Sequence, residues 1–162
     1  MNEAVEQVRE ALARGEDETK EEWIQFLLQD QPYALNVKEV QEILVATDLT
    51  PVPGAPYYVL GVINVRGSIV TVIDGRRRLG IAEAEDTEAQ RWTIVLDVAG
   101  EDVGILVDDV IEVLEFSRAE ISEVAADRSG HVGGLVETEH GMTILLNAWK
   151  LTHDDDLPAA VN

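Results

Sequence analysis

The sequence predicts an all-β protein made of two similar subdomains of about five strands each, with a short helix in front of them. Short apolar stretches alternate with turn signals along most of the 162 residues, a pattern typical of a β-barrel or a β-sandwich. Two blocks of sequence recur later in the same order, which indicates a duplicated unit. Because 46% of the residues are apolar, the chain can bury a core of its own.

The first predicted element is a helix over residues 2–14. Val5, Val8 and Leu12 fall on one helical face, and Gly15 ends the helix. Nearly every residue that follows, up to the first strand, is charged, as in a linker. We therefore treat 1–21 as an N-terminal helix with a charged linker. The pattern leaves open whether this helix contacts a partner or is a frayed extension.

Eight apolar-rich stretches follow as predicted strands. Asp30 and Pro32 mark the first turn, Arg66 and Gly67 join two central strands, and Gly141 lies between the last two. These strands cover residues 23–29, 33–37, 58–65, 68–74, 92–98, 103–107, 133–139 and 142–147.

The first repeated block comprises residues 33–44 and 103–114. Both copies end in Val, two charged residues, Val, one further residue, Glu, an aliphatic residue and Leu. Trp23 and Trp92 begin the strand before each copy. This block predicts equivalent strands about seventy positions apart.

The second repeated block is a pair of strands joined by a turn that contains glycine. Gly61 and Asp74 lie thirteen positions apart, as do Gly134 and Asn147. The offset has grown from seventy to seventy-three, which a loop insertion explains. We infer two structurally similar β subdomains packed as one unit.

The charge balance restricts the classes of partner. Thirty-two acidic residues against twelve basic ones give a net charge of −20, which repels nucleic acid. Only three of the twelve basic residues are lysine, and an acidic, lysine-poor composition is typical of adaptation to a salty cytoplasm. Without a signal peptide or a long apolar run, we expect a soluble, cytoplasmic protein, and this composition favours a halophilic source.

The sequence predicts no enzyme, metal site or cofactor. It has no cysteine, no phosphate-binding glycine loop and no Gly-x-Ser-x-Gly motif, and its three histidines lack metal-ligand spacing. A hydrolase that acts through Asp74 and Asp108 is therefore not favoured.

Residues 51–80, PVPGAPYYVLGVINVRGSIVTVIDGRRRLG, resemble the CheW-like family of chemotaxis proteins. The resemblance extends over about residues 22–152 and implies two intertwined SH3-like, five-stranded β-barrels there, in agreement with the duplication. Residues 153–162 remain as an acidic tail. The motifs that carry the resemblance are Val40–Ile43, Pro51–Pro53, Gly61–Gly67, Val72–Asp74, Val103–Asp108 and Val110.

The resemblance also implies an adaptor function. One surface would bind the cytoplasmic signalling tip of a chemoreceptor, and another would bind the regulatory domain of a CheA-like histidine kinase. Such an adaptor is associated with membrane-bound receptor arrays through its protein partners. A scaffold for a different motility or developmental kinase pathway, built on the same fold, is the alternative.

Candidate binding residues follow from the matched motifs. For the receptor they are Val40, Glu42, Gly61, Asn64, Arg66 and Gly67. For the kinase they are Asp108, Val110 and Val113.

Most of these residues also have a purely structural interpretation. Arg66 can offer its guanidinium to a partner's carboxylate or pair internally with an acid such as Asp74. Gly67 is predicted to take a positive φ, and Gly61 to permit close approach of the partner's backbone or the other barrel's. Asn64 can shape the turn or present its amide to a partner.

The remaining candidates divide in the same way. Val40 and Glu42 would share one face of a strand, yet Val40 can equally belong to the core. Asp108 can contact the kinase or cap a turn.

Three further features within residues 51–80 carry expectations. The basic run 76–78 is expected to neutralise acidic neighbours in its own chain rather than a partner. Thr71 stands where the family usually has proline, and Gly75 where it usually has leucine, so altered local packing is expected there.

Overall fold

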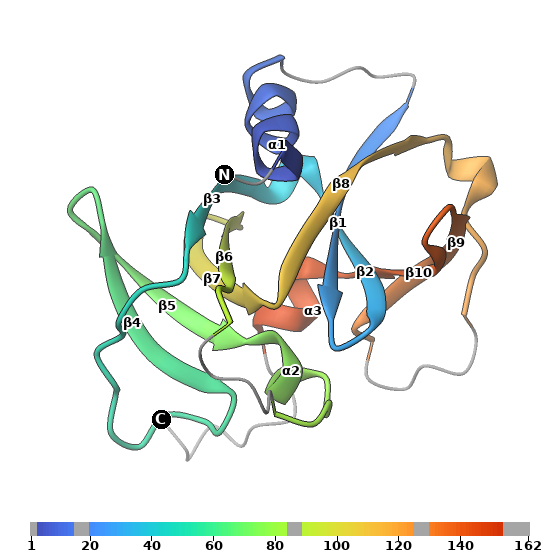
Figure 1. The fold of residues 1–162 in the computed structure, drawn as a ribbon. Coiled ribbons are helices and arrows are strands. Elements are labelled where there is room, and N and C mark those ends of the chain that lie inside the picture. Colours follow the sequence, from blue (N-terminus) through green and yellow to red (C-terminus); the bar gives the residue numbers. More distant parts are fainter. Residues whose placement is uncertain (1–2, 15–19, 84–88, 125–129, 154–162) are drawn as a thin grey trace.

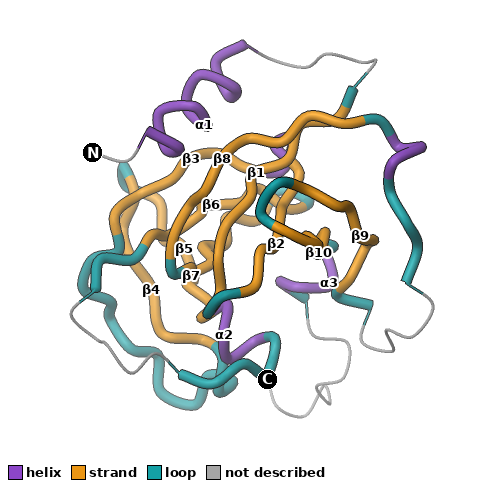
Figure 2. Tube along the Cα trace, turned by 45° about the vertical axis from the view of Figure 1, so that its right-hand side comes forward, coloured by secondary structure: helices purple, strands orange, loops and turns teal. Residues whose placement is uncertain are grey.

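The computed structural model describes residues 3–14, 20–83, 89–124 and 130–153 (Figure 1). Its strands form two five-stranded sheets, which lie side by side as two small barrels (Figures 1 and 2). The predicted all-β class with a short N-terminal helix is confirmed, and the sheets are consistent with two SH3-like subdomains.

We call the two sheets barrel A and barrel B. In spatial order, barrel A consists of β8 (Asp109–Phe116), β1 (Glu21–Leu28), β2 (Gln31–Asn36), β10 (Gly141–Leu146) and β9 (Val132–Thr138). Barrel B consists of β3 (Val40–Val45), β6 (Trp92–Val98), β7 (Glu101–Val107), β5 (Ser68–Asp74) and β4 (Val59–Val65). Short helical turns are η1 (Val37–Glu39), α2 (Gly75–Arg78), η2 (Arg118–Glu120) and α3 (Ala148–Thr152).

The two barrels exchange strands. β3 leaves β1 and β2 of its own half and pairs with β6, while β8 leaves β6 and β7 and pairs with β1. Each barrel therefore contains two strands from one half of the chain and three from the other. The barrels are intertwined, and neither is a continuous segment of sequence.

The strand pairing confirms the internal duplication. β3 skips Gln41 in its ladder with β6, and β8 skips Ile111 in its ladder with β1, so a bulge recurs seventy positions later. Gly61 and Gly134 each follow a second repeated bulge and have φ values of 154° and 155°.

The two tryptophans that begin the strands before each repeat do not occupy equivalent positions in the ladders. Leu44 pairs with Thr93, and its counterpart Leu114 pairs with Trp23, so Trp23 corresponds to Thr93. Trp92 packs in a core shared by both barrels, whereas Trp23 lies in a separate cluster inside barrel A. The two indoles therefore have different structural roles.

Helix α1 (Glu3–Arg14) packs against the two exchanged strands, β8 and β3. Val5 and Val8 are fully buried on the predicted apolar face, and Leu12 packs against the same shared core. The helix is thus a packed part of this fold rather than a frayed extension. Gly15, the predicted end of the helix, lies outside the described residues, as does the acidic tail after His153.

Thr71 lies in β5, and Gly75 follows the end of that strand. Thr71 lies between Val62 of β4 and Val103 of β7 in the sheet. Gly75 begins α2 and is buried, and a Cβ there would come within 2.9 Å of the Leu106 carbonyl oxygen and 3.0 Å of Leu28 Cδ2. A larger residue at position 75 requires these neighbours to shift, so the packing has adapted to glycine.

Candidate partner-binding surface

The β4–β5 hairpin presents Arg66 at its tip. Arg66 and Gly67 have φ values of 50° and 87°, which is the backbone geometry of a tight two-residue hairpin turn. Asn64 Oδ1 accepts a hydrogen bond of 2.9 Å from the Gly67 N–H. The positive φ predicted for Gly67 is therefore present, and the Asn64 side chain shapes the turn.

Arg66 pairs with Glu42, which lies on the neighbouring strand end of barrel B, in β3. Its Nη1 atom donates to Glu42 Oε2 at 2.7 Å, and the two side chains are 79% and 18% exposed. Arg66 thus forms an internal ion pair, but its partner is Glu42 and not Asp74. Asp74 Oδ1 instead accepts hydrogen bonds from the backbone N–H groups of Arg76 and Arg77. Within the described residues only Nη1 of Arg66 is engaged, which leaves Nε and Nη2 for a second carboxylate.

A groove of about 340 Å³ runs between β3 and β4, the two terminal strands of barrel B. We call it the β3/β4 groove. It combines apolar side chains with the Arg66–Glu42 pair and the exposed Asn64, a composition suited to a protein partner. Its lining includes Glu42, Leu44, Val45, Ile63, Asn64 and Arg66.

Two receptor candidates lie behind this surface rather than on it. Val40 is buried in the shared core, and the bulge at Gln41 breaks the simple alternation that would place it on the same face as Glu42. Gly61 is buried where the Thr50 carbonyl leaves no room for a Cβ. The close approach predicted for Gly61 is thus made by the preceding loop of the same barrel, not by the other barrel.

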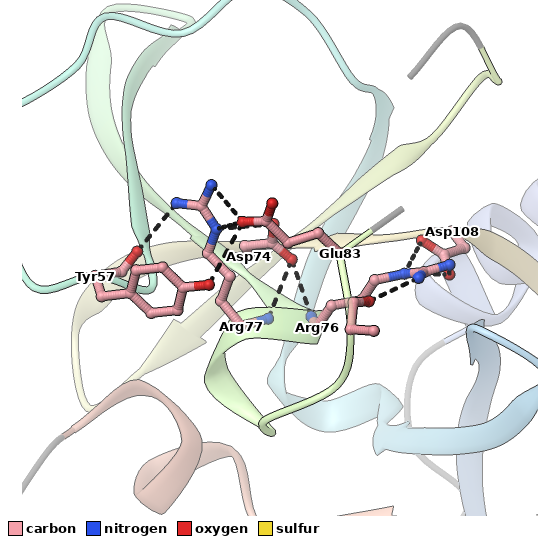
Figure 3. Close-up of polar contacts among 7 residues, drawn as sticks. Tyr57, Asp74, Arg76, Arg77, Glu83 and Asp108 are labelled. Carbon is pink, nitrogen blue, oxygen red and sulfur yellow. Dashed lines mark hydrogen bonds and ion pairs between the residues drawn. The ribbon is translucent and has the colours of Figure 1, made fainter. Parts of the chain in front are cut away.

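Asp108 binds Arg76 in a bidentate ion pair (Figure 3). Arg76 Nη2 lies 2.6 Å from Asp108 Oδ2, and the side chains are only 14% and 19% exposed. The same Oδ2 accepts the backbone N–H of Gln29, in the β1–β2 turn of barrel A, at 2.6 Å. The hydrogen bonds that Arg76 donates to the Asp108 carboxylate raise the pKa of Arg76, so the guanidinium stays charged. Asp108 therefore braces the two barrels against each other.

The other two arginines of the basic run also bind their own chain. Arg77 pairs with Glu83 at 2.8 Å and donates to the Tyr57 carbonyl (Figure 3). Arg78 donates to the carbonyl oxygens of Lys150 and Leu151 near the end of α3. These contacts agree with the intramolecular interpretation. Sequence reasoning missed Arg76 as the partner of Asp108, because nothing in their spacing indicates that they meet.

Val110 and Val113 hold β8 in place. Val110 is fully buried, and Val113 is partly buried against the shared core. Of the three kinase candidates, Asp108 alone carries a polar group, and that group is already paired.

Two absences concern the residues that the structure describes. No group of three or more acidic or histidine side chains there is placed to hold a metal ion. None of the described helices is long and apolar enough to cross a membrane.

The fold and its grooves define a protein-binding module made of two braced β-barrels. The chain belongs to the CheW-like family, since the model of the CheW-like domain matches residues 22–156. It is a chemotaxis adaptor, as its similarity to curated chemotaxis proteins indicates.

Three relatives illustrate the similarity. The chemotaxis protein CheW of Rhizobium meliloti is 41% identical over 86% of this chain and 92% of its own length. CheW of Bacillus subtilis is 31% identical over 91% of this chain and 96% of its own. The crystal structure of the scaffolding protein CheW from Thermoanaerobacter tengcongensis matches with a TM-score of 0.72 and 27% identity, covering 78% of this chain and 88% of that one.

Proposed function

We propose that this adaptor couples the signalling tip of a chemoreceptor to the regulatory domain of a CheA-like histidine kinase, without catalysing a reaction. It would act in the cytoplasm, held at membrane-bound receptor arrays by its partners. The observation that supports this function best is the β3/β4 groove, where a mostly exposed arginine stands beside apolar side chains. An acidic receptor segment can bind the unused guanidinium nitrogens of Arg66.

The proposed receptor contacts are Glu42, Asn64, Arg66 and Gly67 at the surface. Val40 and Gly61 support this surface from behind, because both are buried. For the kinase we propose the region of β8 near Asp108, Val110 and Val113, where the partly exposed Asp108 marks the junction of the barrels.

Arg66→Glu is expected to abolish receptor binding while leaving the fold intact. The substitution places a carboxylate beside Glu42 and opposite an acidic partner, whereas the side chain contributes little to stability because it is mostly exposed. The measurement is a pull-down in high salt with a receptor signalling fragment and the CheA-like kinase of the same host, together with a thermal melt of each variant.

Arg118→Glu provides a matched control for this experiment. Arg118 is 83% exposed and pairs with a 17% exposed Glu21 at 3.0 Å, which closely resembles the geometry of the Arg66–Glu42 pair. Retained receptor binding in Arg118→Glu and lost binding in Arg66→Glu assign the contact to the β3/β4 groove. If the folded wild-type protein binds neither partner, a scaffold for another motility or developmental kinase pathway replaces the chemotaxis assignment of these partners.

We also propose that the acidic composition adapts the protein to a salty cytoplasm. With a net charge of −20, repulsion among carboxylates opposes folding at low ionic strength, and salt screens it. The melting temperature should rise by at least about 5 °C between about 0.1 M and 2 M KCl. A melting temperature that is flat or falls over this range contradicts the adaptation.

A further inference from the structure

We propose that barrel A carries a second docking groove, between β8 and β9, for an extended protein segment whose basic side chains alternate with apolar ones. The groove has a volume of about 480 Å³ and lies between the two terminal strands of barrel A. We call it the β8/β9 groove. Its lining contains none of the proposed receptor contacts and none of Asp108, Val110 and Val113.

The β8/β9 groove is the duplicated counterpart of the β3/β4 groove. The repeat that relates the barrels places β8 on β3 and β9 on β4, with the same bulges in the same places. Glu42, Leu44 and Ile63 of the first groove correspond to Glu112, Leu114 and Val136 of the second. The fold therefore contains two equivalent grooves, one in each barrel.

Apolar side chains form the inner wall of the β8/β9 groove. Leu114, Phe116 and Val136 line it and belong to the apolar cluster inside barrel A. Phe116 stacks on Trp23 with ring centroids 6.0 Å apart, which holds this wall in place. An apolar side chain of a partner can bury its surface against these residues.

The β8/β9 groove is acidic, whereas Glu42 and Arg66 balance each other in the β3/β4 groove. Where the β3/β4 groove has Val45, Asn64 and Arg66, the equivalent positions carry Glu115, Glu137 and Glu139. No lysine or arginine lines the groove among the described residues, although Lys20 Nζ lies 3.4 Å from Glu115 Oε1 at its edge. A segment with lysine or arginine side chains complements this charge, whereas the acidic partner suited to Arg66 is repelled.

A buried hydrogen-bond acceptor beside the β8/β9 groove supports the proposal independently of these charges. Gln25 lies opposite Glu112 in the β1–β8 ladder, and its Nε2 donates to Thr138 Oγ1 at 3.1 Å. Both Glu112 and Thr138 line the groove, so the fully buried amide of Gln25 lies directly behind this lining. Within the described residues, Gln25 Oε1 accepts no hydrogen bond. A lysine or arginine side chain bound beside Glu112 and Thr138 therefore lies next to an unsatisfied acceptor.

The test uses a blocked, fluorescently labelled peptide with three Lys-Val repeats, titrated into the full chain at about 0.5 M KCl. We expect saturable binding to wild type and at least about tenfold weaker binding to Glu112→Gln/Glu137→Gln/Glu139→Gln. The control Glu3→Gln/Glu10→Gln/Asp48→Asn removes three exposed acids elsewhere and leaves the same net charge, so it should bind like wild type. Thermal melts verify that both variants fold.

Two further peptides and one spectrum complete the experiment. A Glu-Val peptide and a Lys-Ser peptide should bind at least about tenfold more weakly than the Lys-Val peptide, since each lacks one of the two matching features. The Lys-Val peptide should also shift the NMR signals of the Gln25 side-chain amide and of Thr138. Equal loss of binding in both variants, equal binding of Lys-Ser, or unshifted Gln25 and Thr138 signals overturns the proposal, because each reduces the effect to overall charge.

Discussion

Arg76→Ala is expected to lower the free energy of unfolding by about 3 kcal/mol, because it leaves the Asp108 carboxylate without its counter-charge in a site that is only 19% exposed. In a protein of this size, such a loss lowers the melting temperature by about 10 °C. Asp108 also accepts the Gln29 N–H, so the unpaired charge is placed where the two barrels meet. Chemical denaturation followed by far-UV circular dichroism measures the change.

Two comparisons isolate the Arg76–Asp108 pair. Arg77→Ala removes a neighbouring arginine whose partner Glu83 is 58% exposed, so it should cost about 1 kcal/mol or less. Adding Asp108→Asn to Arg76→Ala removes the unpaired charge and should restore part of the lost stability. An Arg76→Ala protein as stable as Arg77→Ala would show that the pair does not brace the barrels.

Gly61→Ala is expected to lower the free energy of unfolding by about 3 kcal/mol or to prevent folding. The new Cβ would overlap the Thr50 carbonyl oxygen, and the φ of 154° is one that residues with a side chain rarely adopt. The Thr50 carbonyl is held by the backbone bridge to Val62, the residue next to Gly61, so relaxation requires the loop before β4 to move. The free energy of unfolding, measured at equilibrium, and the affinity for the receptor should therefore fall together.

Alanine substitutions at two other glycines provide a scale for the destabilisation expected at Gly61. At Gly134, the counterpart of Gly61, a Cβ would meet Ile121 Cγ2 at 2.5 Å, and a side chain can rotate away more easily than a carbonyl. At Gly67 a Cβ has no neighbour within 4 Å, so only the φ of 87° is strained, at about 1 kcal/mol. The expected order of destabilisation is Gly61, then Gly134, then Gly67. A larger effect at Gly67 than at Gly61 contradicts the clash.

The eight strands predicted from the sequence share one physical signal, which is a short apolar run ended by a turn. The two strands that this signal did not delimit are β3 and β8, the first strand of each exchanged group β3 to β5 and β8 to β10. Each carries charged residues and a bulge, at Gln41 and at Ile111, which interrupts the alternation of buried and exposed side chains. Their pairing partners are also distant in sequence, so the repeat indicated the existence of these strands but not their exchange.

The candidate site was predictable to the extent that it depends on local geometry. The turn at Gly67 follows from its residue types, and the exposure of Arg66 follows from its place in that turn. The partner of Arg66 was not predictable, because Glu42 comes from a strand whose register depends on the bulge beside it. The pairing of Asp108 with Arg76 likewise depends on how the two barrels pack.

Because β3 to β5 and β8 to β10 are exchanged between the halves, neither half of the chain can complete a barrel alone. The first half supplies β1 to β5, yet β1 and β2 require β8 to β10 to complete their barrel, and β3 to β5 require β6 and β7. A half-length chain could close both barrels only by domain swapping with a second copy. In the full chain, the connection between β5 and β6 replaces that bimolecular encounter with an intramolecular one, at an effective concentration of about millimolar or more. The adaptor thus assembles at any dilution, as one inseparable unit.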